Sequence, residues 1–265
     1  MVREFESSTY WAVILGGSSG LGLASAIKLA RHGMNICILH RNSRAELAEI
    51  ELLFESIKAE KVELLTFNAD VIKPESRDLV IAALKEKVGK PGKVRCLLHS
   101  IAKGNLKALV DDKNPVLESD DFLLTLQNMA ISLNDWVKDF HMAELFAADA
   151  RIISFTSEGS SKAWKHYAAV SVAKSALEAI TRNIALEYAP FGLRANCIQA
   201  GVTDTASLKR IPGSGQLIEH SLQRNPFKRL TTPQDVANVV YLLCKDEASW
   251  INGTVIPVDG GEHIS

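Results

Sequence analysis

The sequence predicts an α/β fold, a single-domain Rossmann-type doubly wound parallel sheet with helices on both faces. Short runs of aliphatic and β-branched residues alternate with longer segments whose apolar residues recur every three or four positions. The short runs are apolar almost throughout, as strands are when helices cover both faces of a parallel sheet. With 265 residues and 47% hydrophobic content, the chain can form one such domain over residues 1–265.

The predicted elements follow one another in a regular order. Residues 11–16 form the first strand, and the helix after it, over residues 21–33, ends at Gly33. A second helix spans residues 45–60. The other predicted strands are residues 35–40, 62–67, 94–100, 151–157, 193–201 and 254–261.

Two polar segments interrupt this alternation, residues 103–121 and 203–229. Each follows a predicted strand, and ligands of such sheets bind beyond the carboxyl ends of the strands. We therefore expect both segments to be walls of a site, with the substrate-binding segment at about 203–229.

Composition argues against several classes of protein. The net charge of −1, with acidic and basic residues interspersed, predicts no nucleic-acid surface. No apolar run approaches the ~20 residues of a membrane span, and no apolar stretch typical of a secretory signal follows the first charges. We expect a cytoplasmic protein that binds neither nucleic acid nor membrane. The widely spaced cysteines predict buried reduced thiols and no metal site.

A glycine-rich turn follows the first predicted strand and opens the first helix. Gly16, Gly20 and Gly22 have G-x3-G-x-G spacing, which permits a tight turn whose N–H groups approach a pyrophosphate. A plain turn is the alternative, but the position between strand and helix favours a dinucleotide site. The residues predicted to bind the phosphates are Gly16, Ser18, Ser19, Gly20, Leu21 and Gly22.

The end of the second predicted strand indicates which dinucleotide binds. An NAD site usually places a carboxylate there, whereas this chain has His40, Arg41 and, slightly further on, Arg44. Two guanidinium groups can hold a 2′-phosphate, so we expect NADPH, with NADH less favoured. The alternative is that both arginines are solvated loop residues. Asp70, with Val71, ends the third strand, where Asp70 either binds the adenine amino group or caps a helix.

Tyr167 and Lys174 are separated by seven positions in a run of small and β-branched residues. On a helix, seven residues turn through about 700°, so both side chains share a face about 10 Å apart along the axis. Val170 occupies the position four residues before the lysine. Packing and solvation are the ordinary roles of such residues, but their context favours catalysis.

Nearly the whole chain resembles the short-chain dehydrogenase/reductase superfamily. The matching positions are the turn at 15–22, residues 68–71, Ser157, Lys174, residues 200–205 and residues 258–261. Most members have Tyr-x3-Lys, whereas Tyr-x6-Lys and HSIA at residues 99–102 resemble the enoyl-acyl-carrier-protein reductase branch, FabL-like members in particular.

The resemblance implies NADPH-dependent reduction of the C2=C3 double bond of a trans-2-enoyl thioester in fatty acid elongation. Hydride would reach C3, so charge appears on the thioester oxygen, two carbons away. A phenol displaced by one or two helical turns suits that geometry. Tyr167 would stabilise the enolate, and Lys174 would bind the nicotinamide ribose and depress the pKa of Tyr167.

Further roles follow from the same resemblance. Ser157 would contact the substrate oxygen or only cap its strand. The asparagine of the carbonyl-reducing members aligns with Met129 rather than with Asn128, which fits enolate chemistry. The implied ligands around the nicotinamide are Ser100, Ile101, Ala102, Lys174, Gly201, Val202, Thr203 and Thr205.

The segment from Ala206 to Arg229 contains five basic residues and one acidic residue, Glu219. A basic rim suits an acidic acyl carrier protein that presents the acyl thioester, and a plain solvated face is the alternative. Four apolar residues could form a lid. The family also implies a homotetramer. The basic residues are Lys209, Arg210, Arg224, Lys228 and Arg229, and the lid residues are Leu208, Ile211, Leu217 and Ile218.

Three rival functions stay open. The chain could reduce a 3-oxoacyl thioester or another ketone, although Val170 argues against that mechanism. It could reduce another activated alkene. It could also be a regulatory protein that binds NADPH without turnover, although an intact Tyr–Lys pair argues against this.

Overall fold

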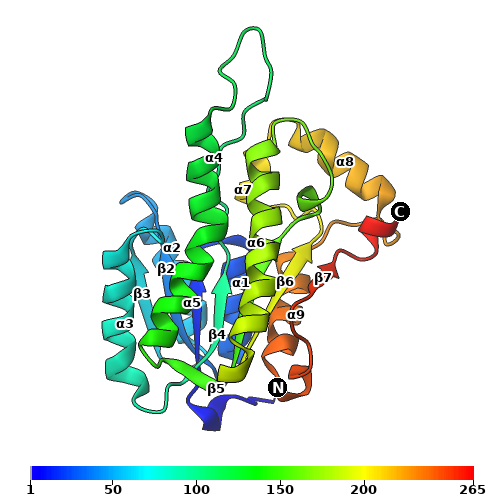
Figure 1. The fold of residues 1–265 in the computed structure, drawn as a ribbon. Helices are drawn as coiled ribbons and strands as arrows, with labels where there is room; N and C mark the ends of the chain where they lie inside the picture. Colours follow the sequence, from blue (N-terminus) through cyan, green and yellow to red (C-terminus); the bar gives the residue numbers. More distant parts are fainter. Residues whose placement is uncertain (1) are drawn as a thin grey trace.

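The computed structural model describes residues 2–265, which form one seven-stranded parallel sheet between two layers of helices (Figure 1). The strand order is β3-β2-β1-β4-β5-β6-β7. The predicted fold class is therefore confirmed. The strands are β1 (Trp11–Leu15), β2 (Asn35–His40), β3 (Leu64–Asn68), β4 (Val94–His99), β5 (Phe146–Thr156), β6 (Leu193–Ala200) and β7 (Val255–Val258).

Nine α-helices lie in the described part of the chain, and a π-helical stretch, Gln127–Ile131, joins two of them. Apolar residues of α3, α5 and α6 pack on one face of the sheet, and those of α1, α2 and α9 pack on the other. The helices are α1 (Gly20–Arg31), α2 (Leu47–Lys58), α3 (Pro74–Val88), α4 (Ser119–Leu126), α5 (Ser132–Met142), α6 (Ala168–Glu187), α7 (Ala206–Lys209), α8 (Ser214–Arg224) and α9 (Pro233–Cys244).

Strand β1 shows why the strands are apolar throughout. Its side chains alternate between the two faces: Val13 and Leu15 belong to one core, and Ala12 and Ile14 to the other. All four are fully buried. A strand buried on both faces has no position for a polar side chain, so the two-periodic pattern is absent from the sequence.

The connections from β1 and β4 diverge at the carboxyl edge of the sheet, because β1 lies between β2 and β4. The amide of Gly16 donates to the carbonyl of Leu39 (2.8 Å), and the amide of Ser100 donates to that of Leu15 (2.8 Å). These bonds place the glycine-rich turn beside the loop after β4. A crevice at such a point is the usual ligand site of a doubly wound sheet.

Some boundaries differ from those expected. Strand β5 begins five residues earlier than predicted, at Phe146, and β7 ends at Val258 rather than continuing to residue 261. The chain turns after Val258 because Gly260 and Gly261 both have positive φ (63° and 82°). Residues 103–118 contain no helix or strand, α4 begins at Ser119 within the first polar segment, and residues 203–229 contain α7 and α8.

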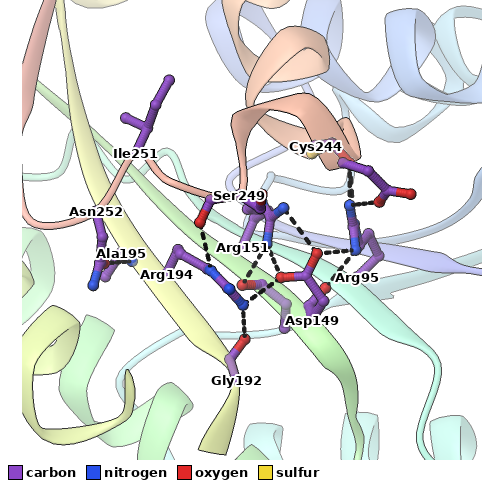
Figure 2. Close-up of polar contacts among 12 residues, drawn as sticks. Arg95, Asp149, Arg151, Gly192, Arg194, Ala195, Cys244, Ser249, Ile251 and Asn252 are labelled. Atoms are coloured by element: carbon purple, nitrogen blue, oxygen red, sulfur yellow. Dashed lines mark hydrogen bonds and ion pairs between the residues drawn. The ribbon is translucent and has the colours of Figure 1, made fainter. Parts of the chain in front are cut away.

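Three arginines from neighbouring strands converge on one carboxylate near the amino ends of β4, β5 and β6 (Figure 2). Arg95, Arg151 and Arg194 all pair with Asp149. Arg95 and Arg151 are only 1% exposed and also donate to the carbonyl groups of Cys244 and Leu243. This arginine ladder fixes the sheet to the end of α9, at the edge opposite the crevice.

The four cysteines, Cys37, Cys96, Cys197 and Cys244, are all free and buried, as expected. Burial raises the pKa of the Cys37 thiol far above its ordinary value. Among residues 2–265, no helix is both long and apolar enough to cross a membrane.

Candidate active site

A cavity of about 250 Å³ lies at the carboxyl edge of the sheet. It is formed by the loops that follow β1, β4, β5 and β6, together with the start of α6 and parts of α7 and α8. Segments far apart in the sequence therefore meet around one space. The predicted site residues that line it are Gly16, Ser19, Gly20, Leu21, Ser100, Ile101, Ala102, Ser157, Tyr167, Lys174, Gly201, Val202, Thr203 and Thr205.

The glycines of the turn after β1 have distinct structural roles. A Cβ on Gly16 would lie 2.4 Å from the carbonyl oxygen of Ser100, and one on Gly22 would lie 2.2 Å from that of Gly16. Neither position can carry a side chain, because a Cβ there would collide with a backbone oxygen. Gly20, the first residue of α1, has φ +54° and faces more open space, with Thr205 Cγ2 3.6 Å from its ideal Cβ. A helix amino terminus that opens on a glycine-lined space fits a dinucleotide pyrophosphate.

Seven of the predicted cofactor residues do not line the cavity. Arg41 pairs with Asp70 at 2.5 Å, so the two groups expected on the 2′-phosphate and the adenine bind each other in this structure. His40 is buried and contacts Asn42, and the Val71 carbonyl accepts from Trp136 in the core. The residues outside the cavity are Ser18, Gly22, His40, Arg41, Arg44, Asp70 and Val71.

Tyr167 lies at the wall of the cavity, immediately before α6. It is the N-cap residue, so the helix begins one position later and only Lys174 of the pair has helical backbone. The Tyr167 hydroxyl lies 3.4 Å from Ser157 Oγ, and its ring is 5.2 Å from that of Trp164. Burial raises the pKa of Tyr167, although the hydrogen bond from Ser157 acts in the opposite direction.

The expectation that Lys174 depresses the pKa of Tyr167 is therefore wrong for this structure. The Lys174 ammonium donates to the Phe155 carbonyl at 2.7 Å. It is 7% exposed, and burial lowers its pKa to about 8. Lys174 is thus a buried ammonium at the cavity wall, which loses its proton more readily than an exposed lysine.

The π-helical stretch between α4 and α5 determines which of two neighbouring side chains reaches the cavity. Met129 lines it and packs against Tyr167 and Val170. Asn128 is buried outside it, where its Nδ2 donates to the Leu124 carbonyl at 2.8 Å. The alignment that placed Met129, not Asn128, at the site is consistent with this geometry.

One wall of the cavity is charged, and the sequence did not predict it. Arg224 at the end of α8 was expected on a basic rim, but its side chain is only 14% exposed and binds Glu158 and Glu262. Lys209 pairs with Asp204, and Arg229 pairs with Asp235. The rim therefore has less net positive charge than the basic residues of its sequence suggest. The positions 158, 224 and 262 are so far apart in the chain that no local pattern connects them.

The rest of the substrate side is apolar. Leu106 and Trp164 line the cavity, and three of the four predicted lid residues join them. Within residues 2–265, no three or more His, Cys, Asp or Glu side chains are arranged so that they could hold a metal ion. The lid residues at the cavity are Leu208, Ile211 and Leu217, while Ile218 lies outside it.

A parallel doubly wound sheet, a glycine turn at its switch point and a Tyr–Lys–Ser group at one cavity define an oxidoreductase of the short-chain dehydrogenase/reductase superfamily. The chain matches a family model over residues 16–263 and belongs to the family described as Enoyl-(Acyl carrier protein) reductase.

Relatives support the same class. The chain is 27% identical to 1-cyclohexenylcarbonyl-CoA reductase of Streptomyces collinus, covering 96% of this chain and 86% of that one. It is 27% identical to the NADPH-dependent enoyl-[acyl-carrier-protein] reductase FabI of Staphylococcus aureus, over 98% of both chains. Its fold is similar to the enoyl-(acyl-carrier-protein) reductase of Anaplasma phagocytophilum in complex with NAD, with a TM-score of 0.85 at 22% identity, covering 100% of this chain and 95% of that one.

Proposed function

We propose that the protein reduces the C2=C3 double bond of a trans-2-enoyl thioester with NADPH. The observation that carries the proposal is the placement of Tyr167 and Lys174 seven residues apart at one cavity, with Val170 at the intervening position where most superfamily members have tyrosine. Bound nicotinamide would supply hydride to C3. The negative charge then forms on the thioester oxygen, which a displaced phenol can reach.

In this mechanism the Tyr167 hydroxyl donates a hydrogen bond to the enolate oxygen. Its raised pKa keeps the phenol protonated, and therefore a donor, at neutral pH. Lys174 would hold the nicotinamide ribose hydroxyls through its ammonium and would add positive charge beside the enolate. Met129 and Trp164 cover Tyr167 with apolar surface, which strengthens the hydrogen bond by excluding water.

The preference for NADPH rests on Arg41 and Arg44, with no carboxylate at the end of β2 itself. Arg41 would leave Asp70 to bind a 2′-phosphate, and Asp70 would then be free for the adenine. Arg44 is exposed and makes no ion pair within residues 2–265. One relative uses NADPH, and a structural neighbour was solved in complex with NAD. Reaction rates with NADPH and with NADH, measured in the same assay, therefore test the preference.

Ketone reduction is the second candidate, and the contact between Ser157 and Tyr167 favours it. The two hydroxyl oxygens lie 3.4 Å apart, so both could hold one carbonyl oxygen that is protonated as hydride arrives. In enoyl reduction, Ser157 would support the same oxygen of the thioester without itself moving a proton.

NADPH absorbance with a trans-2-enoyl thioester and, separately, a 3-oxoacyl thioester tests the proposal. We expect turnover of the enoyl substrate only. The Tyr167→Phe variant should lose at least ~100-fold in kcat, because removal of one oxyanion donor costs about 10²–10³. Tyr188→Phe, at the other end of α6, is the matched control and should keep wild-type rates. Turnover of the oxo substrate instead would refute enoyl reduction.

We also propose that an acyl carrier protein presents the substrate, and that the protein is a cytoplasmic homotetramer. Exposed apolar residues on α6, Val172 and Leu186, and the nearly fully exposed Trp250 support association between copies. Light scattering should give four times 29.0 kDa, and a monomer would refute the tetramer.

A further inference from the structure

The charged wall of the cavity has no part in the proposed reaction. Arg224 Nη2 donates to Glu158 Oε2 at 2.6 Å and to Glu262 Oε1 at 3.0 Å. These three side chains are 14%, 12% and 3% exposed. Glu158 directly follows Ser157 in the chain, so the cluster adjoins the proposed reaction centre.

The donors and acceptors of this cluster are not balanced. Glu158 Oε1 also accepts from Lys162 at 2.5 Å, and Glu262 Oε2 accepts from the Val202 amide at 3.4 Å. Every carboxylate oxygen therefore has a donor from the protein. Arg224 Nε is buried without a partner, and Nη1 makes no hydrogen bond within residues 2–265. Nε is covered by the protein itself, so Nη1 is the donor of this wall that a ligand in the cavity could meet.

The charges around Arg224 indicate what kind of acceptor fits. Glu158, Glu262 and Asp259 all line the same cavity, so a carboxylate or phosphate would meet three negative groups. A plain hydrocarbon would cover the guanidinium and leave its donors unpaired, which is unfavourable for a buried polar group. A neutral carbonyl oxygen satisfies the donors without either penalty.

Arg224 also lies where the substrate can extend. With Glu158, Trp164 and Leu217 it lines both the main cavity and an adjoining pocket of about 400 Å³. Trp164 lies where the two regions meet, since it lines both of them, and its ring is 5.2 Å from that of Tyr167. A group attached to the reacting enoyl unit could therefore pass Arg224.

We propose that Arg224 binds a neutral carbonyl oxygen of the substrate, separate from the carbonyl of the reacting thioester. This inference rests on the proposed function for the reacting group. In an acyl thioester, two parts supply such an oxygen: an amide in the arm that carries the sulfur, or an oxo group on the acyl chain. Arg224 is then a specificity-determining residue whose effect appears mainly in KM.

Two matched pairs of substrates distinguish these sources. The S-ethyl and N-acetylcysteamine thioesters of trans-2-butenoic acid differ by an amide in the arm. The S-ethyl thioesters of trans-2-hexenoic and 5-oxo-trans-2-hexenoic acid differ by an oxo group in the chain. The variant is Arg224→Lys, which keeps the charge beside Glu158 and Glu262 but loses the planar donor fork. Arg229→Lys is the matched control, because Arg229 is exposed and pairs with Asp235 outside the cavity.

In the wild type, we expect the added carbonyl to lower KM at least tenfold in one pair, and that pair identifies the source. Arg224→Lys should abolish the difference while kcat changes less than threefold, and Arg229→Lys should preserve it. Absence of any difference in the wild type, or its survival in Arg224→Lys, would overturn the inference.

A binding measurement separates this inference from the proposed function. Calorimetry with the saturated analogues and NADP⁺ needs no turnover, so the same differences in Kd are expected even if the enoyl thioesters are not reduced. If Arg224→Lys lowers the melting temperature substantially, the double variant Arg224→Gln/Glu262→Gln removes both partners together. It should likewise lose the preference for the carbonyl, and an unchanged preference there would also refute the inference.

Discussion

Lys174 is an ammonium group held almost entirely out of water by β5 and α6. Within residues 2–265 its ammonium makes one hydrogen bond, to the Phe155 carbonyl, and burial lowers its pKa to about 8. The group therefore loses its proton within the range where the enzyme is easily assayed. An amine that has lost its charge holds the ribose hydroxyls less strongly.

We expect the affinity for NADPH to depend on this proton. The Kd should be nearly constant below pH 7 and rise several-fold between pH 7 and pH 9, because bound cofactor requires the charged lysine. Fluorescence titration of NADPH across this range measures the effect. Lys174→Met should bind more weakly and with a flat profile, and a wild-type Kd that is independent of pH would contradict the assignment.

At the scale of one element, two glycines at the start of α1 have different roles: we expect Gly20 to matter for cofactor binding and Gly22 for folding. Gly20 faces the cavity with positive φ, whereas an added Cβ on Gly22 would collide with backbone. We expect Gly20→Ala to cost only about 1–2 kcal/mol of stability but to weaken cofactor binding at least tenfold, since a methyl group enters the phosphate space. Gly22→Ala should instead destabilise the whole protein.

Thermal unfolding and cofactor titration of the two alanine variants check this difference. Gly89→Ala, at the end of α3, is a control for strain alone, because Gly89 has φ +61°, no atom lies within 4 Å of its ideal Cβ, and it lies away from the cavity. Normal cofactor binding by Gly20→Ala would show that the turn does not hold the phosphates.

The sequence was most informative where one element determines a property by itself. The apolar strands and the glycine turn predicted the sheet and the cavity edge, because burial on both faces and positive φ each restrict residue type locally. The wall formed by Glu158, Arg224 and Glu262 could not be found in this way. Its members are brought together only by tertiary folding, and each alone resembles an ordinary surface charge.

At the scale of the whole molecule, the arginine ladder joins β4, β5 and β6 to the end of α9, at the edge of the sheet opposite the cavity (Figure 2). Partial burial acts to raise the pKa of Asp149, but Arg151, with Arg95 and Arg194, outweighs it and the pKa is lowered. The lowered pKa means that this stabilisation is fully present above the ordinary value near 3.8 and is lost as pH falls through the folded-state pKa.

We expect Asp149→Asn to lower the free energy of unfolding by about 3–5 kcal/mol, since it leaves three facing guanidinium groups with too little negative charge. Urea denaturation at pH 7 measures this loss. Asp246→Asn is the control: its carboxylate is 91% exposed, so the loss should stay below about 1 kcal/mol. Equal losses in both variants would contradict a special role for Asp149.

The burial of all four thiols has a practical consequence. None of the four thiols is accessible in the native protein, and burial raises the pKa of Cys197, as it does for Cys37, so little thiolate forms. Cys37, Cys96 and Cys197 lie on three different strands, and Cys244 ends α9, which packs on the same face of the sheet as Cys96. A thiol-modifying reagent therefore reacts only when the sheet opens. The rate of labelling under native conditions then measures how often the core opens.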